Sequence, residues 1–101
     1  MARQRGFIVL YRVLTKAGKS NADRLIRGLN GFEDRSNFGK YVYHRAGFLD
    51  RFPNVKLIRG ALIVRRENAE DLVKFLEGFD AEVHVREVFL NEDDEKALGL
   101  R

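Results

Sequence analysis

"RLIRGLNGF" (24–32) and "DLVKFLEGF" (71–79) repeat one pattern at a distance of 47 residues. In each stretch the apolar residues recur at helical spacing, so each predicts a helix with one apolar stripe along its length. A glycine follows the last turn of each stretch, and glycine there favours a left-handed helix end, predicted at Gly31 and Gly78. The two stretches are therefore interpreted as matching helices of an internal repeat.

Segments with strand character flank both predicted helices. Residues 7–14, "FIVLYRVL", are rich in β-branched and aromatic types and predict the first strand. Ser20 and Asn68 are the predicted N-caps of the two helices. The other predicted strands cover residues 40–46, residues 61–66 with a start near Val55, and residues 81–90.

The resulting order, β-α-β-β-α-β, predicts an α+β fold of the ferredoxin-like class. In that arrangement a four-stranded antiparallel sheet carries two helices on one face. The 101 residues fit a single domain, 1–101. Residues 1–6 form a basic N-terminal arm, and residues 91–101, "NEDDEKALGLR", predict a short acidic C-terminal helix that starts after Asn91.

The composition limits the class of protein. Apolar residues make up 45% of the chain, which is typical of a folded domain, and charged residues reach 34%. The high charge, the absence of Cys and Trp, and the single Pro favour an intracellular protein from a hot environment. Without Cys the chain has neither disulfides nor a thiolate zinc site. Because no apolar run is long enough to span a membrane and no cleavage site follows the first one, we expect a cytoplasmic protein.

The charges are distributed unevenly along the chain. Residues 1–66 contain 15 Lys or Arg and 4 Asp or Glu, whereas residues 67–101 contain 4 and 11. This split indicates that one face of the fold meets an anion, while the acidic part stays in water or contacts a basic partner. A heat-adapted surface whose charges happen to segregate is the alternative.

The stretch "DRSNFGKYVYHR" (34–45) combines basic and aromatic residues. Along the predicted strand Tyr41, Tyr43 and Arg45 share one face. We expect the smaller, more apolar face to pack under the helices, which leaves the tyrosines and the arginine on the open face of the sheet. Aromatic planes with cations nearby are typical of surfaces that bind single-stranded bases and phosphates. The alternative is an ordinary strand whose rings cover the sheet.

We therefore predict a nucleic-acid-binding surface, with RNA preferred over DNA. Its predicted residues are Lys19, Arg24, Arg27, Arg35, Asn37, Lys40, Tyr41, Tyr43, Arg45, Arg51, Lys56, Arg59 and Arg65. The predicted topology resembles that of RNA-recognition motifs. The stretch "RGALIVRR" (59–66) keeps the arginine and glycine of that family's third strand but has Ala61, Ile63 and Arg66 where the family has rings. The resemblance covers the fold and no residue set, so we expect phosphate-led binding of structured RNA, as in a ribonucleoprotein or ribosome.

Other chemistry is less well supported. "GKS" (18–20) resembles the end of a phosphate-binding loop, but Val13 stands where that motif requires glycine. Lys16 and Lys19 near the helix start could hold one phosphate, although a capped helix is the favoured interpretation. His44 and His84 lack the spacing of metal ligands. We predict no metal and no cofactor.

Catalysis is not predicted, because Glu33, Asp34 and Asp50 are loop acids without the geometry of a named reaction. Two alternatives stay open. One is a self-associating or regulatory module that forms a homodimer, or binds a protein partner through its acidic half, using the open sheet or an edge strand. The other is a small metal-dependent nuclease that uses the loop carboxylates.

Overall fold

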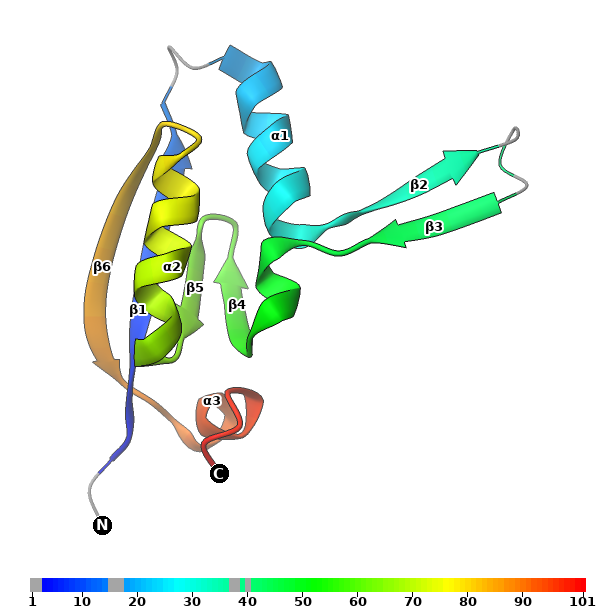
Figure 1. Ribbon diagram of the computed structural model, residues 1–101. Helices are drawn as coiled ribbons and strands as arrows, with labels where there is room; N and C mark the ends of the chain where they lie inside the picture. The colour runs from blue at the N-terminus through cyan, green and yellow to red at the C-terminus, as the bar shows by residue number, and fades with distance from the viewer. Residues whose placement is uncertain (1–2, 15–17, 37–38, 40) are drawn as a thin grey trace.

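The computed structural model describes residues 3–14, 18–36, 39 and 41–101. These residues form a mixed α+β fold with a four-stranded antiparallel sheet, a separate two-stranded sheet and three α-helices (Figure 1). The elements in chain order are β1 (Arg5–Val13), α1 (Gly18–Asn30), β2 (Phe32–Ser36), β3 (Tyr41–Arg45), the 3-10 helix η2 (Phe48–Arg51), β4 (Asn54–Ile58), β5 (Ala61–Val64), α2 (Arg66–Glu77), β6 (Ala81–Phe89) and α3 (Glu92–Ala97).

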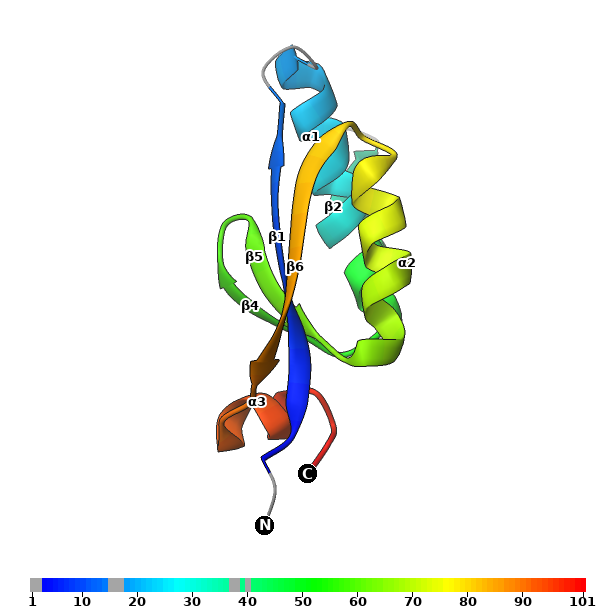
Figure 2. The same cartoon turned by 90° about the vertical axis from the view of Figure 1, so that its left-hand side faces the viewer.

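The main sheet has the order β4-β5-β1-β6, and its neighbouring strands are all antiparallel. On the central strand β1, Val9 lies opposite Leu62 of β5 and Val85 of β6. Figure 2 shows α1 and α2 on the same side of this sheet. The predicted four-stranded antiparallel sheet and the predicted helices are confirmed.

The repeated apolar stripes form the core between the helices and the sheet. The four leucines that match at a distance of 47 residues are all fully buried, and they pack with three strand residues; the cluster contains Leu25, Leu29, Leu72, Leu76, Val9, Leu62 and Val64. Burying a leucine side chain contributes about 1.5–3 kcal/mol. The repeat therefore provides the buried face of both helices.

The strand predicted at 40–46 is found at 41–45, but the prediction that this strand belongs to the main sheet is wrong. Residues 41–45 form β3, which pairs only with β2 in a hairpin that projects from the body of the molecule (Figure 1). The position beside β5 belongs instead to β4, which turns into β5 through Gly60 at a φ of 87°. Both segments have strand character, so the pattern alone does not show which of them pairs with β5.

Two glycines fix the base of the β2–β3 hairpin. A Cβ on Gly31 would collide with the carbonyl oxygen of Arg45, and a Cβ on Gly47 would collide with the backbone of Asn30 and Gly31. The chain entering the hairpin and the chain leaving it therefore touch backbone to backbone. Only residues without a side chain allow this approach, which holds the hairpin to the end of α1.

The helix ends differ partly from the predictions. Both long helices begin two residues before the predicted caps, at Gly18 and Arg66; in α2 the amide of Asn68 already donates to the Arg65 carbonyl oxygen at 3.0 Å. Gly31 has the predicted left-handed conformation, with a φ of 80°. The prediction for Gly78 is wrong, because its φ is −62°.

The left-handed residue after α2 is Asp80, with a φ of 57°. Helical turns continue past Gly78, since the amide of Phe79 donates to Leu76 and that of Asp80 to Glu77. The reversal is thereby delayed by two residues, to a position where aspartate tolerates positive φ better than most residues.

The C-terminal segment forms the predicted helix and covers part of the sheet. Asn91 caps α3, and its side chain accepts from the amide of Asp94 at 2.8 Å. Leu98 is fully buried against Ile63 and Leu90. Ile63 alternates with Leu62 and Val64 of the core, so this cluster lies on the opposite face of the sheet. Figure 2 shows α3 at the lower end of the sheet. The face expected to be open is therefore closed at one end.

Candidate nucleic-acid interface

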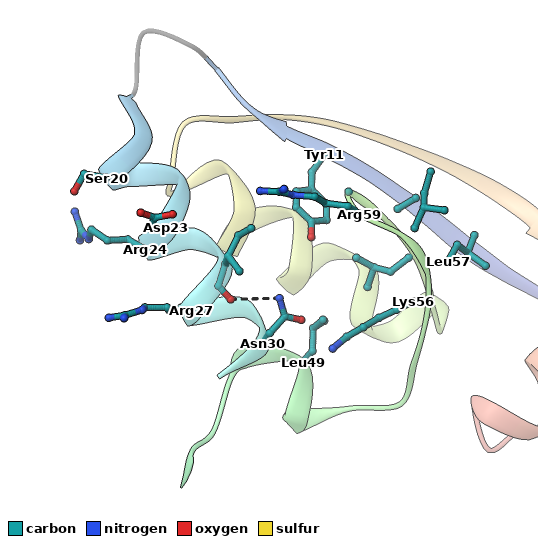
Figure 3. Close-up of a pocket in the computed structure, with 15 residues that line it drawn as sticks. Tyr11, Ser20, Asp23, Arg24, Arg27, Asn30, Leu49, Lys56, Leu57 and Arg59 are labelled. Atoms are coloured by element: carbon teal, nitrogen blue, oxygen red, sulfur yellow. Dashed lines mark hydrogen bonds between the residues drawn. The ribbon is translucent and has the colours of Figure 1, made fainter. Parts of the chain in front are cut away.

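A groove of about 970 Å³ lies between α1 and the β4–β5 turn (Figure 3). The buried face of α1 packs with Leu49 of η2 and with strand residues of the core, and another face of the helix borders the groove. One wall is a single face of α1, whose residues are three or four positions apart along the helix; it comprises Ser20, Asp23, Arg24, Arg27 and Asn30. The opposite wall is residues 56–62, and Tyr11, Ile26 and Leu49 also line the groove.

Four cations line this groove: Arg24 and Arg27 from α1, and Lys56 and Arg59 from the β4–β5 segment. Within the described part of the chain, none of the four forms an ion pair. Arg27 lies over the Phe32 ring, 5.1 Å from its centre, which orients the side chain without neutralising it. Uncompensated like charges around a concavity raise its positive potential and attract anions.

Three arginines outside the groove are neutralised by neighbouring acids. Arg5 and Arg66 both pair with Glu87, at 2.8 and 3.1 Å, and Arg12 pairs with Glu82 at 2.7 Å. The side chains on the described groove walls include one carboxylate, that of Asp23. The groove therefore combines four cations with one acid, while these three arginines are neutralised by neighbouring acids.

Tyr11 and Arg59 lie close together in the groove. Burial raises the pKa of Tyr11 above its usual value, and the positive charge of Arg59 opposes this shift. The phenol therefore stays protonated at neutral pH and can donate a hydrogen bond to an anionic ligand. At the rim Ile58 is 76% exposed, so the groove offers an apolar contact beside its charges.

The β2–β3 hairpin contains the described residues of the basic and aromatic stretch 34–45. Tyr43 is 52% exposed there, and Val42 on the other face of β3 is equally exposed, so the prediction that this face packs under the helices is wrong. Arg45 pairs with Asp34 across the hairpin at 3.0 Å. The tyrosines and Arg45 therefore do not lie on the face of the main sheet.

The predicted binding residues fall into separate groups. Arg24, Arg27, Lys56 and Arg59 line the groove, and Figure 3 shows Arg24 and Arg27 extending from α1 away from Lys56 and Arg59. Arg51 lies over the Phe48 ring, and Arg65 holds the C-terminal segment by donating to the Leu98 carbonyl oxygen at 2.5 Å. Lys19, Arg35 and Tyr41 belong to α1, β2 and β3. Lys16, Asn37 and Lys40 lie outside the described residues.

Sequence reasoning missed Tyr11, Asp23 and Asn30 as groove residues. A signal for each was present. Tyr11 follows Val9 by two residues on β1, so both side chains lie on the side of the strand that faces the helices. Asp23 and Asn30 lie on the same face of α1 as the two arginines.

The acids considered for catalysis have structural contacts. Asp34 pairs with Arg45, and Asp50 accepts a hydrogen bond from the Gly47 amide at 2.7 Å while lying 3.9 Å from His44. His84 contacts Glu82 at 2.6 Å. Among the described residues no three His, Cys, Asp or Glu side chains gather as a metal site would require.

Comparison with protein-family models, with curated proteins and with solved structures finds no match to this chain. None of the helices in the described ranges is long and apolar enough to cross a membrane.

Proposed function

We propose that the groove between α1 and the β4–β5 turn binds the phosphate backbone of a nucleic acid, and that its ligand is structured RNA. The observation that carries this proposal is that four cations line one groove and have no ion-pair partner among the described residues. A phosphate backbone supplies closely spaced negative charges, and its contacts with Lys and Arg contribute most of the affinity of such complexes. The protein acts in this proposal as a non-catalytic component of a ribonucleoprotein.

The proposed fold is ferredoxin-like with an inserted hairpin. Without β2, β3 and η2, the elements up to β6 follow the order β1-α1-β4-β5-α2-β6, which is the β-α-β-β-α-β order of that class. The insertion lies between α1 and β4, so it adjoins the groove. A bound RNA longer than the groove would meet the exposed hairpin next.

The preference for RNA rests on Asp23. Its carboxylate lines the groove beside the arginines, where it repels phosphate but accepts hydrogen bonds from neutral donors. The ribose 2′-hydroxyl is such a donor and is absent from DNA. Ser20 and Asn30 on the same face of α1 add further hydrogen-bonding groups.

The direct test is a binding titration of a labelled RNA hairpin by fluorescence anisotropy between about 50 and about 200 mM salt. We expect the variant Arg24→Ala, Arg27→Ala, Arg59→Ala to reduce the slope of log affinity against log salt by about 2–3 units, since each lost phosphate contact removes about 0.7–0.9. The matched control is Lys74→Ala. Lys74 occupies the position of Arg27 in the second repeat and is paired with Glu70 at 3.2 Å, so its removal leaves the slope unchanged.

Equal slopes for the wild type and the groove variant would rule out the groove as the phosphate site. A third variant, Arg45→Ala, addresses the hairpin. If this change alone flattens the salt dependence while the groove variant does not, the site belongs on the hairpin and the proposal is wrong.

A further inference from the structure

The two edge strands of the main sheet are protected to different degrees from pairing with another chain. β4, at one edge, has five residues, follows Pro53, contains Lys56 and has an irregular register between Lys56 and Ile58. Short length, lysine, proline and bulges are the features by which natural sheets prevent pairing with another chain. β6, at the other edge, has nine residues and contains no Pro, Gly or Lys. In the described part of the chain no strand pairs with its outer side.

The side chains of β6 have a self-complementary pattern. Val83 and Val85 point to the side of the helices and pack against the core, while Glu82, His84 and Arg86 lie on the opposite face. The strand is symmetric about His84 in its residue types: Glu82 lies two residues before it, and Arg86, of opposite charge, lies two residues after it. The neighbours of His84, Val83 and Val85, mirror each other as well.

We propose that β6 pairs antiparallel with β6 of a second copy of this chain, about a two-fold axis at His84. This pairing covers residues 81–87 of both copies and joins the two sheets into one. Glu82 of each copy then faces Arg86 of the other, and Val83 of each faces Val85 of the other. A two-fold interface requires such self-complementarity, because the same strand supplies both sides.

The charges select this register over its neighbour. With the axis at Val85, His84 would face Arg86 and Val83 would face Glu87, so the opposite-charge pairs would be lost. The two pairs of Val83 with Val85 would be replaced by a single pair of Val85 with its own copy. Opposite-charge and apolar cross-strand pairs stabilise a sheet, whereas like charges directly opposite each other destabilise it. The axis at His84 is therefore favoured.

Glu82 and Arg86 are suited to meet across this interface. Arg12 and His84 hold the Glu82 carboxylate at 2.7 and 2.6 Å, and these contacts lower the pKa of Glu82, that of His84 being the larger cause. The carboxylate is thus charged and oriented, and it has lone pairs for another donor. Arg86 has no carboxylate partner in the described residues; its Nη1 donates to the Val85 carbonyl oxygen at 2.8 Å.

α2 borders the same edge of the sheet as β6 and would extend the proposed interface. A shallow depression beside β6 is lined by Phe7, Val73 and Val85, with the ion pair between Glu70 and Lys74 at its border. In the proposed dimer α2 of the second copy runs antiparallel to α2 beside this depression. The groove is at the opposite edge of the sheet, so dimerisation leaves it free, and the two proposals can fail separately.

A disulfide test is available because the chain has no Cys. At the axis, directly opposite Cα atoms lie about 4.5–5.5 Å apart, which is within disulfide reach. We expect nuclease-treated His84→Cys to form a covalent dimer on mild oxidation, and the wild type to show an average mass by light scattering that rises with concentration toward twice 11.7 kDa. Lys56→Cys, on the protected edge, is the matched control and stays monomeric under the same oxidation.

The charge pairing has its own test. Arg86→Glu puts two acids opposite each other at two places and weakens the dimer about tenfold, while adding Glu82→Arg to it restores association. A wild type that stays at the monomer mass at every concentration, with no His84→Cys crosslink, overturns the proposal. So does crosslinking through Val85→Cys or Lys56→Cys in its place, or a mass increase that occurs only when RNA is added.

Discussion

The two long helices share one apolar pattern and differ in what surrounds them. α2 packs on β1 and β6, and two of its basic residues are ion-paired: Lys74 with Glu70 and Arg66 with Glu87. α1 buries the matching leucines in the same core and also contacts η2, and its arginines have no acid within ion-pair distance in the described chain. An apolar stripe therefore predicts which face of a helix is buried. It does not predict which further elements the helix contacts.

The difference between the halves follows from the insertion. After α2 the chain enters β6 within a few residues, whereas after α1 it makes the hairpin and η2 before reaching β4. η2 then occupies space beside α1, and the groove opens between α1 and the β4–β5 turn. The segment that breaks the repeat is thus the one that creates the candidate site.

The largest difference between the halves concerns packing. Leu25 and Leu72 are matching residues and both are fully buried. A Leu→Ala change in a core costs about 2–5 kcal/mol, depending on how far the site can collapse. We expect Leu72→Ala to fall in the upper half of this range and Leu25→Ala in the lower half, because α1 borders a groove and can settle into the space. Urea unfolding of both variants measures this, and a larger loss for Leu25→Ala would refute it.

The helix ends provide a second matched pair, Gly31 and Gly78. Gly31→Ala should lower the free energy of unfolding by about 2 kcal/mol or more, because it places a side chain at positive φ against the Arg45 carbonyl. Gly78 has helical φ, and its added Cβ would lie 3.3 Å from the Phe75 carbonyl oxygen, so Gly78→Ala should change stability by less than about 1 kcal/mol. Similar losses at both positions would show that the hairpin base is not tightly held.

The acids of the two helices test ligand preference. Asp23 in the groove and Glu70 on α2 are matching residues, and Glu70 is ion-paired with Lys74. We expect Asp23→Ala to raise DNA affinity and to reduce the ratio of RNA to DNA affinity about tenfold, because a ribose acceptor and a negative charge are both removed. Glu70→Ala should leave the ratio unchanged. If the ratio is the same for all three proteins, Asp23 does not read the ribose.

The smallest expected effect is the pH dependence of stability that arises from Glu87 of β6. Hydrogen bonding from Arg5, with a further contribution from Arg66, lowers the pKa of Glu87. A lowered folded-state pKa gives stability that is present above the unfolded value, near 4.3 as an approximate reference, and is lost as pH falls through the folded value. The stability advantage of the wild type over Glu87→Gln should therefore shrink on acidification, as followed by urea unfolding at several pH values. An advantage that grows below about pH 4 would contradict this assignment.

The sequence predicted the repeated elements and not the insertion. Periodicity identified both helices and the strand segments, because burial imposes a period of 3.6 or 2 on any packed element. It does not identify a strand's partner, so the pattern predicts 40–46 at the position beside β5 that β4 occupies. The deciding contact is the backbone crossing at Gly31 and Gly47, whose residues are far apart in the pattern.

The sequence predicts the basic residues of the candidate site but not where the site lies in the fold. Counting charges along the chain identified the cations, four of which line the groove. Their placement around one groove depends on how α1 packs in the fold, which no local pattern records. The sequence pattern predicts binding at the tyrosines of 34–45, which belong to the hairpin, whereas Tyr11, in the first strand, lines the groove.

Backbone amide chemical shifts of the ¹⁵N-labelled protein, recorded while a structured RNA is added, show most directly where RNA binds. We expect the largest changes at Tyr11, along residues 20–30 of α1 and along residues 56–62, with β6 and α2 little affected. Changes confined to β6 and α2, or an unchanged spectrum with RNA in excess, would contradict RNA binding in the groove.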